Sequence, residues 1–429
     1  LKAANKESGT EVPTLMSYDF GGTSVEVKTT GNNASYTARA AQYYIFADQK
    51  EAIEDLITRF SPAEKPAKSV TQLPEFKEIH SYIGSDAALE FFARVPDLSK
   101  LAPPEQKDNP FLVFARNVHV DKVHVFGGGI SFAGDAMRFR GAILGDAAPE
   151  TLFDIGGTSR KVLETQSVVG PGPIFTISSF DLAATYQLIR GGLTGALTPK
   201  QSGNVMMVEG LAQGFLGMSL SDALGLFTGE FASETSFNED ASMQRLFAVT
   251  IQKQQEVLRL LRVALEKVTV AEETAGGTTF LDVSYPSHDP VTGADKRDFY
   301  YVAVTPKMIL VAPHKAMLRE AIERMNSKPG ETPPNAGLAN AEFAHMRSLF
   351  PEKLSGIEGA DFERIPWDKI VSNLAKQASN AAKEASAPNT PQVDWQKLIK
   401  PDIFSRHLHL FMGAWWKDSN GVYFDSYLQ

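Results

Sequence analysis

The sequence predicts an α+β protein built from two related modules in tandem, with antiparallel sheets packed by amphipathic helices. Hydrophobic residues make up 43% of the 429 residues and charged residues 22%, which is typical of a chain that buries sizeable cores. Strand and helix patterns occur in blocks, with hairpin signals between them, rather than as regular strand–helix–strand units. Several segments also recur in the same order, which indicates an internal duplication.

The first repeated element is a Gly-Gly turn that leads into a strand. The segment GGTSVEV (21–27) returns as GGTTFLDV (276–283). Paired glycines favour a tight turn, and the alternation of apolar and polar residues that follows is typical of a half-buried strand.

The second repeated element is a short strand followed by a helix. YYIFADQKEAIEDLITRFS (43–61) matches MILVAPHKAMLREAIERMNS (308–327). Each copy reads as an apolar strand, a turn and an amphipathic helix, and in the first copy Ile53, Leu56 and Ile57 share one helical face.

Further matches follow in the same order. Helical signals occur at LPEFKEI (73–79) and NAEFAHM (340–346), and hairpin endings at GDAMRFRGAIL (134–144) and SNGVYFDSYL (419–428). The Asn-Gly pair at 420–421 is a strong hairpin signal, because both residues tolerate a positive φ. We therefore expect a duplicated unit over about 21–144 and 276–428.

The duplication is incomplete at its start. The helix pattern QKQQEVLRLLRVALEKV (252–268) and the segments before it have no counterpart upstream. We expect a first module over 1–146 that lacks its N-terminal half, and a complete second module over 147–429. Because the sequence starts at Leu1 rather than Met, we also expect that a leader was removed or that only part of the gene product is present.

The segments FARNVHV (114–120) and FSRHLHL (404–410) place ionisable residues at matching positions. The matched pairs are His119 with His409 and Arg116 with Arg406. His407 and His409 are expected to alternate on one strand face, and a His-x-His pair can bind a metal, but no further ligand lies at a telling spacing. Half-buried histidines and structural ion pairs are the favoured interpretation.

Part of the chain resembles a known family. Residues of about 170–370 resemble the bacterial proteins catalogued as domain of unknown function 3352, and residues 1–100 resemble them more weakly. The resemblance lies in the order of SLSDALGLFTGEFA, a strand, a helix with LEKV, a strand with GGT, ILVAPHKAMLREAIERM and AEFAHM. In that family a Gly-x-Ser-Leu stretch leads to a Gly-Glu pair, here Gly217, Ser219, Leu220, Gly229 and Glu230. The resemblance implies an exported protein, periplasmic or extracellular, and brings no established activity or catalytic residue.

Composition and motifs exclude several classes. A net charge of −9 argues against nucleic-acid binding, and the lack of cysteine removes disulfides and thiolate chemistry. No apolar run is long enough for a transmembrane span. The glycine clusters fit no phosphate-binding motif, the chain has no nucleophile elbow or H-E-x-x-H, and the Asp-rich segment 287–298 departs from calcium-loop spacing.

We therefore expect a non-enzymatic binding or assembly protein with no catalytic, cofactor-binding or metal-binding residues, whose partner is a protein or a second copy. One alternative is a carrier of a lipid or other apolar ligand, which predicts a large apolar cavity. Another alternative is a hydrolase with an unfamiliar site, which would require ionisable groups with perturbed pKa values in a cleft. Glu230 is a candidate isolated acid, and polarity at the end of a strand explains this residue equally well. Near the C-terminus, aromatic residues are expected on both faces of a hairpin, and 374–395 is expected to be a mobile insertion.

Overall fold

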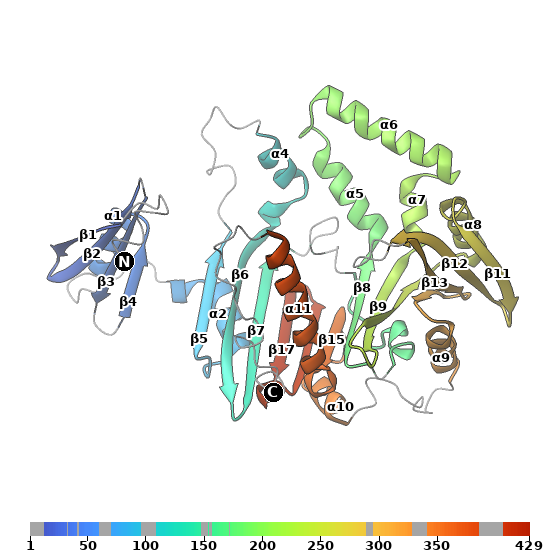
Figure 1. Ribbon diagram of the computed structural model, residues 1–429. Helices are drawn as coiled ribbons and strands as arrows, with labels where there is room; N and C mark the ends of the chain where they lie inside the picture. Colours follow the sequence, from blue (N-terminus) through green and yellow to red (C-terminus); the bar gives the residue numbers. More distant parts are fainter. Residues whose placement is uncertain are drawn as a thin grey trace. The chain divides into compact units, whose positions relative to one another are not determined.

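The computed structural model describes residues 13–31, 33–40, 43–59, 70–95, 109–146, 153, 157–170, 172–288, 295–327, 341–385 and 406–429 (Figure 1). These residues form helices and antiparallel sheets, so the predicted α+β class is confirmed. The chain divides into two compact units, residues 1–77 and 78–429.

The smaller unit is a four-stranded antiparallel sheet in the order β1-β2-β3-β4, followed by one helix. Its elements are β1 Thr14–Phe20, β2 Thr23–Thr30, β3 Asn33–Ala40, β4 Tyr43–Ala47 and α1 Lys50–Arg59. Gly21 and Gly22 turn β1 into β2 with φ values of 59° and 79°, which favour glycine. Ile53 and Ile57 of α1 are buried against the sheet, as the helical periodicity predicts.

The larger unit contains one 13-stranded antiparallel sheet in the order β11-β12-β13-β14-β10-β9-β8-β15-β16-β17-β7-β6-β5. Its strands are β5 Leu89–Arg94, β6 Val123–Ala133, β7 Ala136–Gly145, β8 Ile174–Asp181, β9 Thr228–Phe237, β10 Met243–Thr250, β11 Thr269–Ala275, β12 Thr278–His288, β13 Asp295–Val304, β14 Met308–Ala312, β15 Gly356–Asp361, β16 Leu410–Lys417 and β17 Gly421–Leu428. Helix α2, Pro74–Ile83, contains the division between the two units, which falls after Lys77. The other helices are α4 Pro110–Asn117, α5 Leu182–Leu193, α6 Pro199–Leu216, α7 Leu220–Gly225, α8 Gln254–Ala264, α9 Lys315–Met325, α10 Ala341–Arg347 and α11 Trp367–Ala385.

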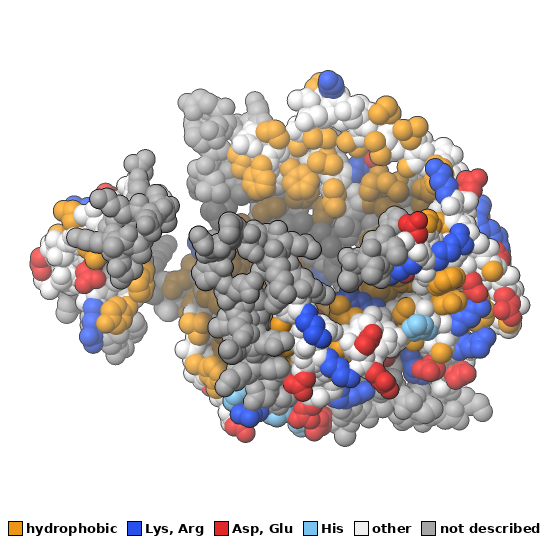
Figure 2. Space-filling model, viewed as in Figure 1, with side chains coloured by type: hydrophobic (Ala, Val, Ile, Leu, Met, Phe, Trp, Pro, Cys, Tyr) orange, Lys and Arg blue, Asp and Glu red, His pale blue; other side chains and the backbone are white. Residues whose placement is uncertain are grey.

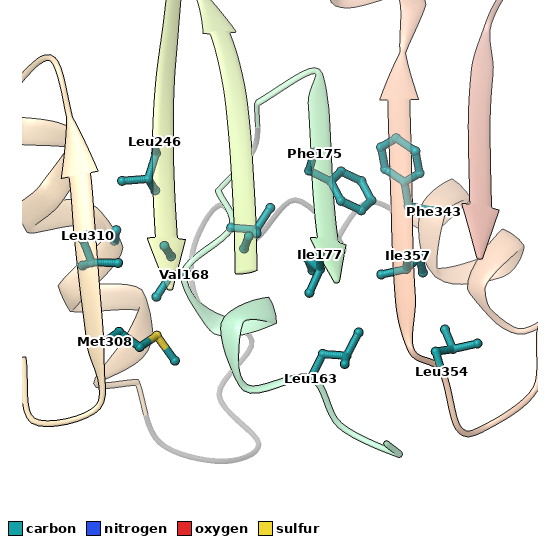
Figure 3. Close-up of a cluster of buried hydrophobic side chains, with 14 of the residues drawn as sticks. Leu163, Val168, Phe175, Ile177, Leu246, Met308, Leu310, Phe343, Leu354 and Ile357 are labelled. Carbon is teal, nitrogen blue, oxygen red and sulfur yellow. The ribbon is translucent and has the colours of Figure 1, made fainter. Parts of the chain in front are cut away.

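Hydrophobic cores lie on both faces of this sheet. Successive strand residues point to opposite faces, so Leu310 joins a cluster covered by α9 and α10, whereas Ile309 joins a second cluster under α8. Figure 3 shows the first cluster, in which side chains of neighbouring strands meet Leu163 and Val168 from the segment before β8.

The same order of elements occurs twice along the chain. Among the described elements, the first copy runs β1–β4, α1, α2, β5, α4 and the hairpin β6–β7. The second copy runs β11–β14, α9, α10, β15, α11 and the hairpin β16–β17. The second Gly-Gly turn has φ values of 58° at Gly276 and 80° at Gly277, close to those of the first turn. The module boundary at residue 146 stays a prediction, since the compact units divide at residue 77.

Two local predictions differ from the structure. His407 is helical and β16 begins at Leu410, so the placement of His407 and His409 on one strand face is wrong. The predicted hairpin at Asn420 is present, but Asn420 does not take a positive φ. Instead Asp418 Oδ1 accepts hydrogen bonds from the backbone N–H groups of Asn420 (2.8 Å) and Gly421 (3.2 Å), which makes a turn of a different kind.

Two predicted loops lie partly outside the described residues. The Asp-rich segment 287–298 is described only up to His288 and from Asp295, where β12 and β13 pair as a hairpin would. The predicted insertion 374–395 is described only up to Ala385, where α11 ends.

Candidate functional site

Glu230, the candidate isolated acid, is fully buried in β9. Its Oε2 accepts hydrogen bonds from Thr165 N (2.8 Å) and Oγ1 (3.1 Å), and its Oε1 lies 3.3 Å from Arg160 Nη1. Buried carboxylates need such partners, because an unpaired one is very costly. These contacts hold the segment before β8 against the sheet. The carboxylate of Glu230 therefore has a structural role.

Glu234, four residues further along β9, also binds the segment before β8 through its carboxylate. Its carboxylate accepts hydrogen bonds from the backbone N–H groups of Gly170 (2.6 Å) and Gly172 (2.9 Å) and lies 3.5 Å from Arg324 Nη2. Arg324 also donates to Val168 O at 2.8 Å, and burial lowers the pKa of its guanidinium. A Cβ at Gly170 or Gly172 would lie under 3 Å from the carboxylate, which explains the glycines.

Within the described part of the chain, the matched histidines His119 and His409 belong to no cluster of metal-binding side chains. His119 takes a left-handed conformation after α4, at φ 58°, and Arg116 lies in the last turn of that helix. His409 Nδ1 lies 2.7 Å from Glu363 Oε1 on an exposed surface. In the described ranges no three His, Asp or Glu side chains gather closely enough to hold a metal ion. The role of Arg406 stays a prediction.

The predicted aromatic cluster lies at the seam between β7 and β17. Tyr82 of α2 contacts Tyr423 edge to face at 5.1 Å and donates a hydrogen bond to Phe424 O. Across the seam, Arg138 donates two hydrogen bonds to the buried carboxylate of Asp425. Burial raises the pKa of Tyr427, whose ring lies under Arg138, to about 12. The charge of Asp425 is neutralised by Arg138 and the surrounding rings are packed, which is typical of a structural polar network.

The aromatic residues of β16 and β17 point to both faces, as alternation predicts. Trp416 stacks on Tyr423 at 6.0 Å, on the face that carries α2. Trp415 points to the opposite face, where its indole covers Gly356 and leaves no room for a Cβ. Phe424 stacks on Phe139 on that face.

A pocket of about 370 Å³ lies between α9 and the β11–β12 hairpin. Charged and polar side chains line much of it, among them Glu273, Lys315, Arg319 and Asn326. Lys315 is paired with Asp282 at 2.5 Å. Ala275, Phe280 and Ile322 also line the pocket, so the lining mixes polar and apolar side chains rather than being predominantly apolar, as a lipid site would be.

Helices α4, α5 and α6 carry an unusual concentration of exposed apolar side chains, seen in Figure 2 as orange over these elements. We call this set the apolar helical surface: Phe111, Leu182, Ile189, Met206, Met207, Val208, Leu211 and Phe215. None of the residues of α6 is buried, although five of them are large and apolar and are 58–68% exposed. A helix that is apolar on several sides is normally buried, so the exposed side chains of this one form a candidate binding surface.

The ends of α6 are well formed. Thr198 and Gln201 make a reciprocal capping box at its start, and Gly217 ends it in a left-handed conformation at φ 70°. Local sequence signals therefore set both ends of the helix, and Glu209 in its second half is paired with Arg190 of α5 at 2.7 Å. Sequence reading missed it as a surface because apolar residues extend beyond the face shared by Met207, Leu211 and Phe215, to Val205, Met206 and Leu216, so the helix has no clear polar side.

Glu358 of β15 is an ionisable residue on the sheet face opposite Ile357. Its carboxylate lies over Gly413 of the neighbouring strand. Burial alone raises its pKa, and no hydrogen bond or ion pair connects its carboxylate to another residue in the described part of the chain. An ionised carboxylate here is destabilising.

Replacing Glu358 by glutamine is expected to raise the melting temperature at pH 7.5 and to change it little at pH 4. A raised folded pKa means that the native state binds the proton more tightly, so stability falls as pH rises from about 4.5 through the folded pKa. Thermal unfolding of both proteins across this pH range checks the sign. Glu352→Gln, at a side chain that is 71% exposed, should show no such pH-dependent gain; an equal gain in both variants would contradict the assignment.

No family model matches the chain, and comparison with curated proteins and with solved structures gives no match. The resemblance to domain of unknown function 3352 stays a prediction. Among the described residues, no helix is both long and apolar enough to cross a membrane.

Proposed function

We propose that this protein is a non-enzymatic binding protein that assembles with a second copy of itself through the apolar helical surface. The observation that carries this proposal is α6, an 18-residue helix without a buried residue that exposes Met206, Met207, Val208, Leu211 and Phe215. Covering these side chains would remove apolar area from water, which is the dominant favourable contribution to most protein–protein association.

A second helix is a suitable partner for this surface. Gly210 and Gly214 lie one turn apart on α6, and nothing lies within 4 Å of the position that a Cβ would take at either residue. Glycines at this spacing let another helix approach closely, while the flanking methionines adapt their shape to the partner. Two copies of α6 meet these requirements reciprocally, as a two-fold interface demands.

The buried acids support a non-enzymatic role. Glu230 and Glu234 are occupied by hydrogen-bond donors of the same chain, so neither is available to a substrate. The pocket beside Lys315 has a mixed polar and apolar lining, which supports the carrier alternative less than a predominantly apolar cavity would. A periplasmic or extracellular location rests on the family resemblance alone.

We also infer that the chain arose by duplication of one module. The repeated order of elements and the matching φ values of the two Gly-Gly turns support this inference. Under this proposal the described part of the first module has counterparts of β11–β17, and no described strand there is a counterpart of β8, β9 or β10.

Native mass spectrometry tests the assembly. The unmodified protein is expected at multiples of its 46.8 kDa mass, whereas Leu211→Gln/Phe215→Gln should appear mainly as a single chain, because loss of central apolar contacts weakens such interfaces at least about tenfold. Val162→Gln is the matched control, since Val162 is 71% exposed but lies outside the apolar helical surface.

An assembly that survives the double substitution would contradict the role of α6. A single chain that carries a few hundred daltons of bound material, lost on denaturation, would instead support the apolar-ligand carrier.

A further inference from the structure

The 13-stranded sheet is locally symmetric about its β7–β17 pair. Outward from this pair lie β6 and β16, and then β5 and β15. On one side β15 pairs with β8 and the sheet continues. On the other side the sheet ends at β5, with no further strand in the described part of the chain (Figure 1).

The hairpin turns align the two sides residue by residue. Ile130 lies three residues before the turn-closing Ala133, and Trp415 lies three residues before Asp418, which closes the equivalent turn. Their partners on the outer strands are Leu89 and Gly356. Counting along the strands then makes Phe91 the counterpart of Glu358.

The outer strand β5 has the properties of an uncovered edge. Leu89 is 57% exposed and Phe91 is 43% exposed, although both are large and apolar. Glu90, between them, points to the opposite face, where its Oε2 lies 2.9 Å from His80 Nδ1 of α2. Free strand edges bind other strands unless they are protected.

We propose that the free edge of β5 binds an antiparallel strand of another polypeptide, of the chemical kind of β8. That strand would carry large apolar side chains at alternate positions, separated by small hydroxyl residues, as in IFTISSFD (174–181). The proposal rests on the inferred duplication and is independent of assembly through α6.

The register of the bound strand follows from the pairing of β15 with β8. Gly356 pairs with Ser178, and Glu358 pairs with Thr176. In the bound complex, Leu89 therefore faces the position of Ser178, and Phe91 faces the position of Thr176. Main-chain hydrogen bonds give such strand addition its affinity, and alternate side chains give it specificity.

The first test uses the 429-residue protein and a fluorescein-labelled synthetic peptide PIFTISSFD with a lysine tail for solubility. Saturable binding is expected by fluorescence anisotropy. A peptide with proline at the position of Ile177 should bind at least about tenfold more weakly, because proline removes an N–H donor and disrupts pairing. No binding, or equal binding of both peptides, would overturn the proposal.

The second test locates the bound strand by disulfide cross-linking. Because the chain has no cysteine, an introduced cysteine is the only thiol in the protein. Phe91→Cys protein is incubated under mild oxidation with peptides that carry cysteine at the position of either Thr176 or Ile174. Disulfide formation should be several-fold greater with the first peptide, and small for both with the exposed control Phe132→Cys. Preferential reaction at the Ile174 position, or with the control protein, would reject the β8-like register.

These tests and the α6 test can fail separately. Native mass spectrometry of Leu211→Gln/Phe215→Gln reports on the apolar helical surface alone. Peptide binding by that same variant should equal binding by the unmodified protein, and loss of peptide binding in it would contradict the β5 site.

Discussion

Replacing Glu234 by alanine lowers the free energy of unfolding of the larger unit by about 3–5 kcal/mol, the range expected when one partner of a buried ion pair is removed. The change leaves the guanidinium of Arg324 without its closest anion. It also leaves the N–H groups of Gly170 and Gly172 without their acceptor. Unpaired buried donors add to the cost.

Urea unfolding followed by tryptophan fluorescence measures this change, because all four tryptophans lie beyond residue 77 and report on the larger unit. The matched control is Glu352→Ala, whose ion pair with Lys161 is exposed on both sides. Exposed pairs contribute about 0–1 kcal/mol. Similar losses in both variants would show that the contacts of Glu234 do not hold the loop before β8.

Replacing Phe175 by alanine is expected to cost about 3–5 kcal/mol, the usual range for removing a fully buried aromatic ring. Phe175 is 1% exposed and meets Phe343 of α10 edge to face at 5.4 Å. It also covers Gly359, where a Cβ would lie 2.5 Å from its ring. The truncation would therefore leave a cavity between α10 and the centre of the sheet.

The control for this truncation is Phe132→Ala at the tip of the β6–β7 hairpin, where the ring is 65% exposed. We expect a change within about 0.5 kcal/mol, since surface substitutions away from special features rarely do more. The same urea transition measures both variants. A cost below about 1 kcal/mol for Phe175→Ala would contradict the packing around α10.

Elements with a strong local signal were predictable from the sequence. The Gly-Gly turn at Gly276 and Gly277, the strand 308–312 and the helix that follows it lie where their patterns indicate. Each depends on turn residues or periodicity within a few positions. The helix pattern 252–268 was also recognised, although α8 ends at Ala264.

Features that depend on distant partners were not predictable. The carboxylate of Glu230 belongs to a strand, but its role depends on Thr165, which lies 65 positions away. Nothing local distinguishes such an acid from a catalytic one. The apolar side chains of α6 extend beyond one helical face, so periodicity did not mark it as a surface. The repeated segment 114–120 did not reveal that α4 ends at Asn117 and that His119 lies just beyond it.

The pairing of β7 with β17 has a consequence for biosynthesis. Leu144 pairs with Gly421, so about 280 residues must follow β7 before its partner has been translated. Strand pairings this distant in sequence form slowly, because the intervening chain must first be ordered. Until β17 leaves the ribosome, the hairpin β6–β7 would be without its neighbour, and nascent chains would then depend on chaperones to keep that edge from aggregating.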